Sequence, residues 1–423
     1  MSQLKNYLKG VGDIMDKTIL ILATLDTKGK EAGFLAENIW KLGKKTIIID
    51  VGELGLPEIK ADISREEVAE AGGISLKEFF KDTKNKKAAP VMAKGAIKIV
   101  SDLVKNNKAH GIISLGGTKG TSLATEVMRT IKYGFPKIMV STMASSDVSV
   151  FIDISDIIMF PSVSDVLGLN PFLKRVLLNA ASAICAMAQN TGDIIIEKGL
   201  LIGISNVGIT TPGAMKAIAL FQEAGYETIV FHAVGTGGRA MEQMIKEGII
   251  GAVFDYALVE ISNYLYGGLN NGGPYRLTAA GKAGIPQVIC PGGVEVFALW
   301  IKEGEALPDQ YKGRTEIRHS SLITTLRFNK KELINTAREV VERLKYTKDE
   351  AVFMIPTGAY SIYSKKGTPF YDPDADKAFA DYIKENLPRN FKIIEIDADL
   401  TDEVFVAAAV KQMIELINKK KKT

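Results

Sequence analysis

The chain has 423 residues, of which 46% are hydrophobic and 24% charged, so it can bury more than one hydrophobic core. This composition excludes intrinsic disorder, and the 39 glycines follow no three-residue period, which excludes collagen. The net charge of +4 equals the contribution of four lysines at 419–422, so the rest of the chain is neutral and we expect no nucleic-acid partner. We interpret the lysine run as a frayed, solvated end.

Cysteine, histidine and hydropathy patterns bear on three questions: the redox environment of the protein, a zinc site, and a membrane segment. Cys185 and Cys290 lie in apolar runs, which predicts buried thiols in a reducing environment. Three histidines and two cysteines, none at ligand spacing, argue against a zinc site. No apolar run approaches the ~20 residues of a membrane span, and the first, at 18–25, lacks the form of a signal peptide. We therefore expect a soluble, cytoplasmic protein with no membrane partner.

Short, near-continuous apolar runs alternate with longer helical patterns through the first half of the chain. Such runs are typical of parallel strands that helices cover on both faces. The polar segment 52–90 is longer than an ordinary connection, so we expect an excursion that carries a short helix. We predict strands at 18–24, 45–51, 111–115, 137–142 and 156–160, with helices at 29–42, 90–106, 119–132 and 171–189.

A change of composition at 190–199 starts a second series of the same kind. The fold class is therefore α/β, with two Rossmann-like doubly wound domains and mainly parallel sheets. We place a nucleotide-binding domain at 1–195 and a second α/β domain at 196–423. The two halves open alike, which leaves an internal duplication open. Strands are predicted at 200–205, 228–233, 251–255, 286–290, 351–355 and 391–396, with helices at 212–223, 238–247, 276–283, 331–345, 374–386 and 402–418.

A glycine-rich turn joins the third predicted strand to its helix. Glycines let backbone N–H groups approach an anion, and the amino end of a helix adds partial positive charge. This is phosphate-binding chemistry, although the turn matches neither GxxxxGK[ST] nor GxGxxG. A glycine-rich turn without a ligand is the alternative. The candidate binding residues are Gly116, Gly117, Thr118, Lys119, Gly120 and Thr121.

Two further polar turns follow the first and fourth predicted strands. Because parallel strands end at one edge of a sheet, we expect these turns beside the glycine-rich turn. Asp26 suits a ribose hydroxyl or a metal-bound water and Lys28 a phosphate, with helix capping by Asp26 or Thr27 as the alternative. The candidates are Thr24, Asp26, Thr27 and Lys28 in the first turn, and Ser141, Thr142, Ala144 and Ser145 in the second.

A second glycine turn follows a predicted strand in the other half of the chain. It also suits an anion, and Arg239 is able to make a bidentate contact. His232, at the strand end, is a candidate acid or base, with a structural hydrogen-bonding role as the alternative. The candidates for a second ligand are His232, Gly235, Thr236, Gly237, Gly238 and Arg239.

Taken in order, these turns resemble the ATP-binding domain family that is named after the tomato mosaic virus resistance protein. The family includes many bacterial and archaeal proteins of about this length, and the resemblance extends from about residue 17 to about residue 418. This chain departs from it in having Lys119 where a small residue is usual and Glu295 where an Asp is usual. The matching segments are LATLDTKGKE, DISREEVAEAGG, SLGGTKGTSLAT, PKIMVSTMASSD, SVSDVLGLN, FHAVGTGGRAME, AAGKAGIPQVICPGG and PTGAYSIY.

The resemblance implies a bound ATP with magnesium and self-association as a homodimer. It places the nucleotide against the turns at 24–28, 116–121 and 141–145, with Asp26 and Asp147 as candidates for the ATP-bound magnesium. We therefore expect an ATP-binding protein whose reaction, if any, the sequence does not identify. Two alternatives stay open. One is an ATP-dependent enzyme that transfers a phosphoryl group to, or ligates, a small anionic metabolite in the cleft between domains, and the other is a protein-interaction module stabilised by ATP.

Overall fold

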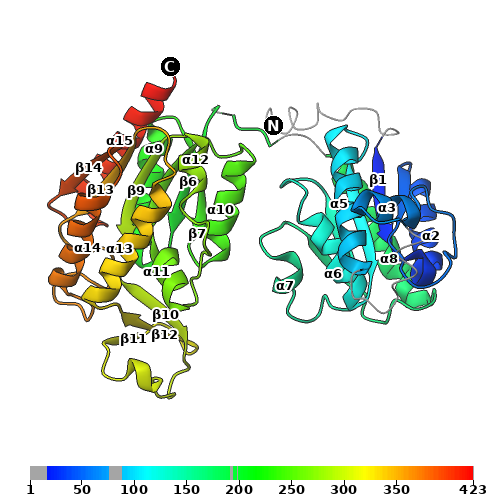
Figure 1. The fold of residues 1–423 in the computed structure, drawn as a ribbon, viewed down its shortest axis with the longest axis horizontal. Coiled ribbons are helices and arrows are strands. Elements are labelled where there is room, and N and C mark those ends of the chain that lie inside the picture. The colour runs from blue at the N-terminus through cyan, green and yellow to red at the C-terminus, as the bar shows by residue number, and fades with distance from the viewer. Residues whose placement is uncertain (1–16, 76–87, 191–193, 198, 423) are drawn as a thin grey trace. The chain divides into compact units, whose positions relative to one another are not determined.

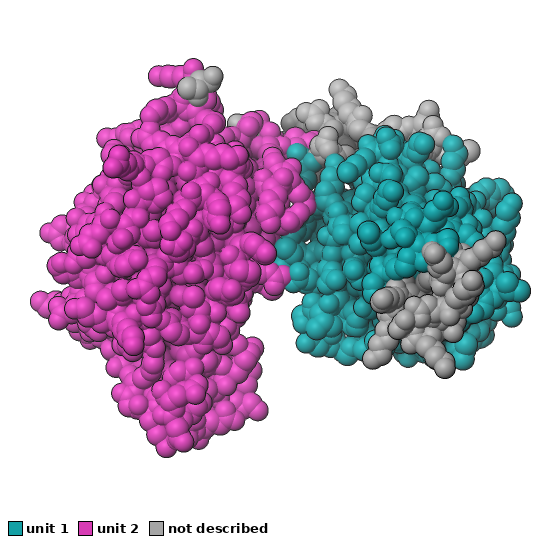
Figure 2. Space-filling model, viewed as in Figure 1, with its two compact units in different colours: residues 1–194 teal, residues 195–423 magenta. Residues whose placement is uncertain are grey.

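The computed structural model describes residues 17–75, 88–190, 194–197 and 199–422. The chain divides into two compact units, here called unit 1 (residues 1–194) and unit 2 (residues 195–423), which Figure 2 distinguishes by colour. Each unit contains its own parallel sheet covered by helices. The prediction of a two-domain α/β chain with mainly parallel sheets is confirmed.

Unit 1 contains a five-stranded parallel sheet in the order β2-β1-β3-β4-β5 (Figure 1). This is the flavodoxin-like order, in which the crevice for a ligand opens between the first and third strands. Each predicted strand of this half is present, with ends within two residues of those expected. The strands are β1 (Thr18–Ala23), β2 (Lys45–Asp50), β3 (Gly111–Gly116), β4 (Lys137–Ser141) and β5 (Ile158–Pro161).

Helices cover both faces of this sheet. They are α2 (Leu25–Lys41), α3 (Arg65–Gly72), α5 (Ala88–Lys105), α6 (Thr118–Met128), α7 (Ser149–Ile152) and α8 (Pro171–Gln189). Because side chains alternate along a strand, Ile19 and Ile21 pack with α2 and α8, whereas Leu20 and Leu22 pack with α3, α5 and α6. The helix α3 confirms the short helix expected in the excursion, of which residues 76–87 lie outside the described residues.

The helix α8 is long and apolar enough to cross a membrane by length and composition alone. Its apolar face is part of the core of unit 1. Asn170 caps it by accepting a hydrogen bond from the N–H of Leu173 at 2.8 Å, and Pro171 is the first helical residue, as predicted. Cys185 on this helix and Cys290 in unit 2 are both buried and free, and burial raises the pKa of Cys185 to about 11.

Unit 2 contains a six-stranded parallel sheet in the order β14-β13-β9-β8-β6-β7. Counted from its own first strand, β6, this sheet repeats the arrangement of unit 1, with the second strand outside the first and the later strands on the other side. All six strands coincide with predicted ones. They are β6 (Leu201–Asn206), β7 (Glu227–His232), β8 (Ala252–Ala257), β9 (Gln287–Gly292), β13 (Ala351–Pro356) and β14 (Phe391–Ile396).

Helices cover this second sheet on both faces as well (Figure 1). They are α9 (Thr211–Glu223), α10 (Thr236–Lys246), α11 (Val259–Tyr266), α12 (Ala279–Ala283), α13 (Lys330–Leu344), α14 (Pro373–Asn386) and α15 (Glu403–Lys420). Val352 and Met354 pack with α9 and α15, whereas Phe353, which points to the opposite face, packs with α13 and α14. The core of unit 2 therefore lies on both sides of β13.

A small antiparallel sheet follows β9 and was not predicted. Its strands β10 (Val296–Trp300), β11 (Glu316–Arg318) and β12 (Ile323–Arg327) lie in the order β10-β12-β11. The strands β11 (EIR) and β12 (ITTLR) are short and carry polar residues, so no continuous apolar run marks them. The strand β10 is a run of five apolar residues, VFALW, which the prediction did not include. The helix α11 was also missed, because its start directly after β8 continues the apolar pattern of the strand.

Candidate nucleotide site

The strand registers of unit 1 bring the ends of β1, β2 and β3 together. Ala23 of β1 pairs with Asp50 of β2, and Leu22 pairs with Ser114 of β3. The loops that follow these strands enclose a hollow of about 270 Å³, here called the switch-point pocket. It is lined by Thr24, Asp26, Thr27 and Lys28 after β1, by Val51, Glu53 and Leu54 after β2, and by residues 116–120 and Leu123 after β3.

Two of the three predicted turns therefore lie at one pocket, between the first and third strands of the sheet. In a doubly wound sheet this is the place where the chain leaves neighbouring strands toward opposite faces, and where ligands bind. The helix α2, which follows β1, packs on one face of the sheet, and α6, which follows β3, packs on the other. The topology alone thus opens the crevice that the switch-point pocket occupies.

The amino end of α6 forms one wall of the pocket. Gly117 is its N-cap residue, and no side-chain hydrogen bond caps the helix. The N–H groups of the first turn have no carbonyl within the helix to bind, and they carry the positive end of the helix dipole. An added Cβ at Gly117 or Gly120 would meet no atom closer than 3.7 Å, so these glycines leave room beside the backbone. This wall suits an anion.

An ion pair joins this wall to the loop after β2. Lys119 Nζ lies 2.5 Å from Glu53 Oε2, and the Lys119 side chain is 65% exposed whereas that of Glu53 is 9% exposed. The other carboxylate oxygen, Glu53 Oε1, is buried and has no hydrogen-bond partner in the described part of the chain. Glu53 was not among the predicted site residues, and its place just beyond the second strand is the sequence signal that could have found it.

Two aspartates hold the loops on the other side of the pocket. Asp50 Oδ1 accepts hydrogen bonds from the N–H groups of Leu25 (3.1 Å) and Gly52 (2.8 Å), so it ties the start of α2 to the end of β2. Burial raises the pKa of Asp50, and these two hydrogen bonds oppose the shift. Asp26 Oδ2 accepts from the N–H of Leu54 at 2.6 Å. Asp26 is therefore in the pocket, and its carboxylate also orders the loop after β2.

The third predicted turn, after β4, supports the glycine-rich turn and does not line the pocket. Thr121 and Ser141 share a hydrogen bond of 2.6 Å between buried hydroxyls. The lining of the switch-point pocket does not include Thr142, Ala144 or Ser145. Their predicted contact with a nucleotide stays a prediction.

Metal binding by side chains alone has no support in the structure. Asp147 is exposed, and its Oδ1 accepts a hydrogen bond from the N–H of Ser149 at 2.9 Å. This hydrogen bonding holds the pKa of Asp147 below its ordinary value. Within residues 17–75, 88–190, 194–197 and 199–422, no three His, Cys, Asp or Glu side chains gather as a metal site requires. The predicted magnesium would therefore depend on ligand oxygens.

In unit 2 the glycine turn after β7 is already bound to an anion, and that anion is part of the chain. Glu260 Oε1 accepts hydrogen bonds from the N–H groups of Gly235 (2.7 Å) and Gly238 (3.0 Å). A Cβ at Gly238 would lie 1.9 Å from Glu260 Oε2, so glycine is required for this close approach. We predicted a second ligand at the N–H groups of Gly235 and Gly238. Because both already donate to Glu260, they are not free to bind that ligand.

Glu260 belongs to a buried ionic cluster around Arg276. The guanidinium of Arg276 contacts Glu260 (2.7 Å), Glu242 (3.3 Å) and Asp255 (3.2 Å from Nη1), and none of these residues is more than 4% exposed. Burial raises the pKa values of Glu242 and Glu260, although Arg276 opposes the shift. Burial disfavours the charged form of Arg276, but the three carboxylates outweigh it and raise its pKa. The cluster is a structural centre with no exposed group.

The remaining candidates of this turn lie near the surface. His232 is exposed, and its Nδ1 lies 3.4 Å from the carbonyl oxygen of Asn206. Thr236 is exposed and Arg239 is half-buried. None of them lines the switch-point pocket. Their role as ligands of a second substrate stays a prediction.

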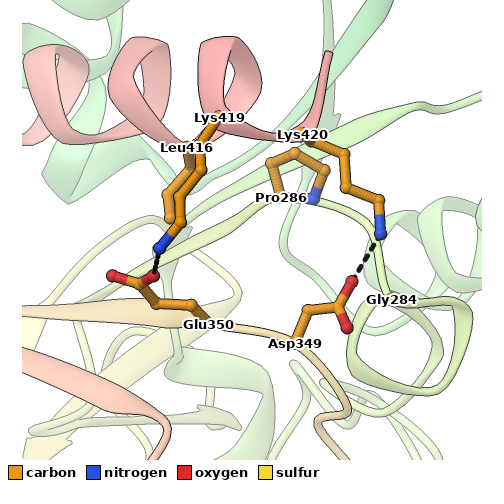
Figure 3. Close-up of a pocket in the computed structure, with 7 residues that line it drawn as sticks. All are labelled: Gly284, Pro286, Asp349, Glu350, Leu416, Lys419 and Lys420. Atoms are coloured by element: carbon orange, nitrogen blue, oxygen red, sulfur yellow. Dashed lines mark hydrogen bonds and ion pairs between the residues drawn. The ribbon is translucent and has the colours of Figure 1, made fainter. Parts of the chain in front are cut away.

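A second hollow, of about 360 Å³, lies at the opposite, amino edge of the unit 2 sheet (Figure 3). Asp349 and Glu350 directly precede β13, and they pair with Lys420 and Lys419 at the end of α15. The interpretation of the lysine run as a frayed end is therefore wrong for these two lysines, which are helical and ion-paired. Because the charged groups satisfy one another and ligands of parallel sheets bind at the carboxyl edge, this hollow is the weaker candidate.

Two family models cover most of the chain. They are described as Uncharacterised protein family (UPF0261), the N-terminal domain matching residues 17–193 and the C-terminal domain residues 199–417. A UPF0261 protein of Clostridium tetani is 38% identical over 96% of this chain and 100% of its own length. The ToMV resistance protein Tm-1(GCR237) of Solanum lycopersicum is 29% identical over 78% of this chain and 44% of its own length. The resemblance drawn from the turns is confirmed.

Solved structures are much more distant. The UDP-GlcNAc 2-epimerase of Neisseria meningitidis, solved with UDP-GlcNAc bound, is matched over 88% of this chain and 100% of its own length. The identity is 12% and the TM-score 0.23, which is too low to support a conclusion about function. The fold described above rests on the strand orders themselves.

Proposed function

This chain belongs to the UPF0261 family, and from that membership and the geometry of unit 1 we propose that it binds ATP, or a related nucleotide, at the carboxyl edge of β1, β2 and β3. The observation that carries the proposal is the switch-point pocket, whose wall is the uncapped amino end of α6. The N–H groups after Gly117 bind the phosphates, and the helix dipole favours their negative charge.

Side chains add to this wall. Lys119 supplies a point charge at the first turn of α6, where it pairs with Glu53. Lys28, in the turn after β1, also lines the pocket. Magnesium enters with the nucleotide and is held mainly by phosphate oxygens. Two carboxylates line the pocket, and because Glu53 is paired with Lys119, Asp26 is the one that is able to bind the ion or its waters.

The test measures the melting temperature of the full chain with ATP, ADP and NAD, with and without magnesium. A ligand at a hundred times its Kd adds about 2.7 kcal/mol to the free energy of unfolding of the unit that binds it. For a unit of this size, that raises the melting temperature by about 5–10 °C. Absence of a shift with every nucleotide would contradict the proposal.

Two substitutions at Gly117 locate the site. The backbone there has φ −85°, and an added Cβ meets only Thr142 Oγ1 at 3.8 Å, so a side chain fits. Aspartate and asparagine cap helices equally well, and each adds a few tenths of a kcal/mol to the stability of the free protein. They differ in charge, because only the carboxylate repels phosphate. Gly117→Asp should abolish the nucleotide-induced shift, and Gly117→Asn should retain more of it.

Turnover is a separate question, which release of ADP decides. An enzyme releases ADP in the presence of its second substrate, whereas a nucleotide-stabilised interaction module shows the melting shift alone. Since Glu260 already binds the N–H groups of Gly235 and Gly238, the structure gives no support for an anionic substrate at those groups. We therefore propose binding, and no reaction.

A further inference from the structure

One carboxylate oxygen of Glu53 has no hydrogen-bond partner in the part of the chain that the structure describes. The side chain is 9% exposed, Oε2 pairs with Lys119 Nζ, and Oε1 is buried without a partner in the described residues. A buried acceptor left unpaired costs about 1–3 kcal/mol, and more when it is charged. Such a group calls for an explanation by an absent donor. Because Glu53 lines the switch-point pocket, a ligand bound there is able to supply that donor.

The chemistry of the missing donor follows from the neighbours of Glu53. Its charge is already balanced by Lys119 at 2.5 Å, so a second cation at the same carboxylate gains little. Asp26, the other carboxylate in the pocket, is hydrogen-bonded to the N–H groups of Leu54 and Gly55, and no cluster of acids suited to a metal exists among the described residues. A neutral hydroxyl is the donor that fits.

The position of Glu53 indicates which hydroxyl. It stands beyond the end of β2, next to β1, while the phosphate-binding wall follows β3. In dinucleotide-binding doubly wound sheets, an acidic residue about 20 residues beyond the turn after the first strand accepts a hydrogen bond from the ribose 2′-OH. Glu53 follows the turn at 24–28 at a comparable spacing, although the glycine-rich turn of this chain follows β3. We propose that Glu53 Oε1 accepts a hydrogen bond from a ribose hydroxyl of the nucleotide. This inference rests on the proposed function and adds that the site distinguishes ribose from deoxyribose.

The test compares ligands that differ by one hydroxyl. Isothermal titration of the full chain measures binding of ATP, 2′-deoxy-ATP, 3′-deoxy-ATP and inorganic tripolyphosphate. A hydrogen bond to a charged acceptor contributes about 1.5–3 kcal/mol, so one deoxynucleotide should bind the wild type at least about tenfold more weakly than ATP. Glu53→Ala should bind that deoxynucleotide and ATP equally, and it should not lose affinity for tripolyphosphate.

Controls separate the possible failures. Glu37→Gln makes a matched charge change on the exposed face of α2 and should preserve the preference for ATP. Should Glu53→Ala fail to fold, Glu53→Gln keeps the side-chain shape and should reduce the preference at least about threefold, since a neutral acceptor binds more weakly. Wild-type protein that binds ATP and both deoxynucleotides equally would overturn this inference and leave the proposed function standing. Protein that binds neither ATP nor tripolyphosphate would overturn both.

Discussion

Glu260 and Arg276 form an ion pair of 2.7 Å in which neither side chain has any exposed surface. Removal of Glu260 leaves Arg276 in contact with Glu242 and Asp255. The loss of this one pair therefore costs less than the about 3–5 kcal/mol of a buried charge that is left without any partner. Glu260→Ala also deprives the N–H groups of Gly235 and Gly238 of their acceptor. Each buried N–H group left without an acceptor costs about 1–3 kcal/mol, so we expect Glu260→Ala to lower the free energy of unfolding of unit 2 by about 2–6 kcal/mol, as urea denaturation measures.

The matched control for this prediction is an exposed ion pair in the same unit. Lys377 pairs with Asp381 on α14, with 71% of the lysine side chain exposed. Lys377→Ala should change stability by less than about 0.5 kcal/mol, because surface pairs contribute little. Equal effects of the two substitutions would contradict a structural role for the buried cluster.

Two helical glycines should respond to alanine in opposite directions. At Gly95 on α5, an added Cβ would lie 1.8 Å from the carbonyl oxygen of Val68 on α3, and backbone cannot move aside cheaply. Helix propensity favours alanine by about 1 kcal/mol, but overpacking of this kind costs about 1–3 kcal/mol or more. Gly95→Ala should therefore destabilise unit 1.

Gly33 on α2 provides the comparison. An added Cβ there meets only Ile59 atoms at 3.7 and 3.8 Å, an ordinary contact. Gly33→Ala should raise stability by about 0.5–1 kcal/mol, since helix propensity then acts unopposed. Thermal denaturation of both variants measures the difference, and stabilisation by Gly95→Ala would show that α3 and α5 are not packed as described.

The pH dependence of stability should change when Asp50 is replaced. Burial raises its pKa in the folded protein, with Asp26 raising it further and Arg65 lowering it. A folded-state pKa above the unfolded value means that the native state holds the proton more tightly. The resulting stability is complete below the unfolded pKa of about 3.8–3.9 and is lost as the pH rises through the raised folded-state pKa.

Asp50→Asn removes this titration and keeps an oxygen for the N–H groups of Leu25 and Gly52. Its stability relative to the wild type should therefore rise with pH above about 4 and then level off. Asp50→Ala, which leaves both N–H groups without their acceptor, should be destabilised by about 1–3 kcal/mol across the range. Chemical denaturation from pH 4 to pH 8 measures both, and a pH-independent difference for Asp50→Asn would contradict the raised pKa.

Sequence patterns predicted the parallel sheets well because each strand is buried on both faces and therefore consists of a continuous apolar run. Ile19 to Leu22 have no exposed surface at all. Two of the antiparallel strands, β11 and β12, have no such run, whereas β10, VFALW, has one and was missed. The strand β11, Glu316–Arg318, has three residues, of which Glu316 and Arg318 are exposed, so only its pairing with β12 reveals it as a strand.

Sequence patterns predicted the site residues that lie together in one short segment. They missed those whose role depends on contact with a residue far away in the sequence. The glycines of the turn at 116–120 are enough to predict an anion-binding turn from the sequence alone. Glu53 gains its importance only from Lys119, which lies 66 residues away. Likewise, the glycines at 235–238 suggest an anion, but nothing local indicates that Glu260 supplies it. Pairings of this kind follow from strand order, which the runs themselves do not determine.

The two sheets share a strand order, yet their carboxyl edges are closed in different ways. In unit 2 the anion beneath the glycine turn is the side chain of Glu260, so it belongs to the chain itself and is present without any ligand in solution. In unit 1 the amino end of α6 at the carboxyl edge has no side-chain cap, and Glu53 Oε1 nearby has no hydrogen-bond partner among the described residues. Bound nucleotide should therefore raise the unfolding temperature of unit 1, which contains the switch-point pocket, whereas the anion of the unit 2 turn is already supplied by the chain.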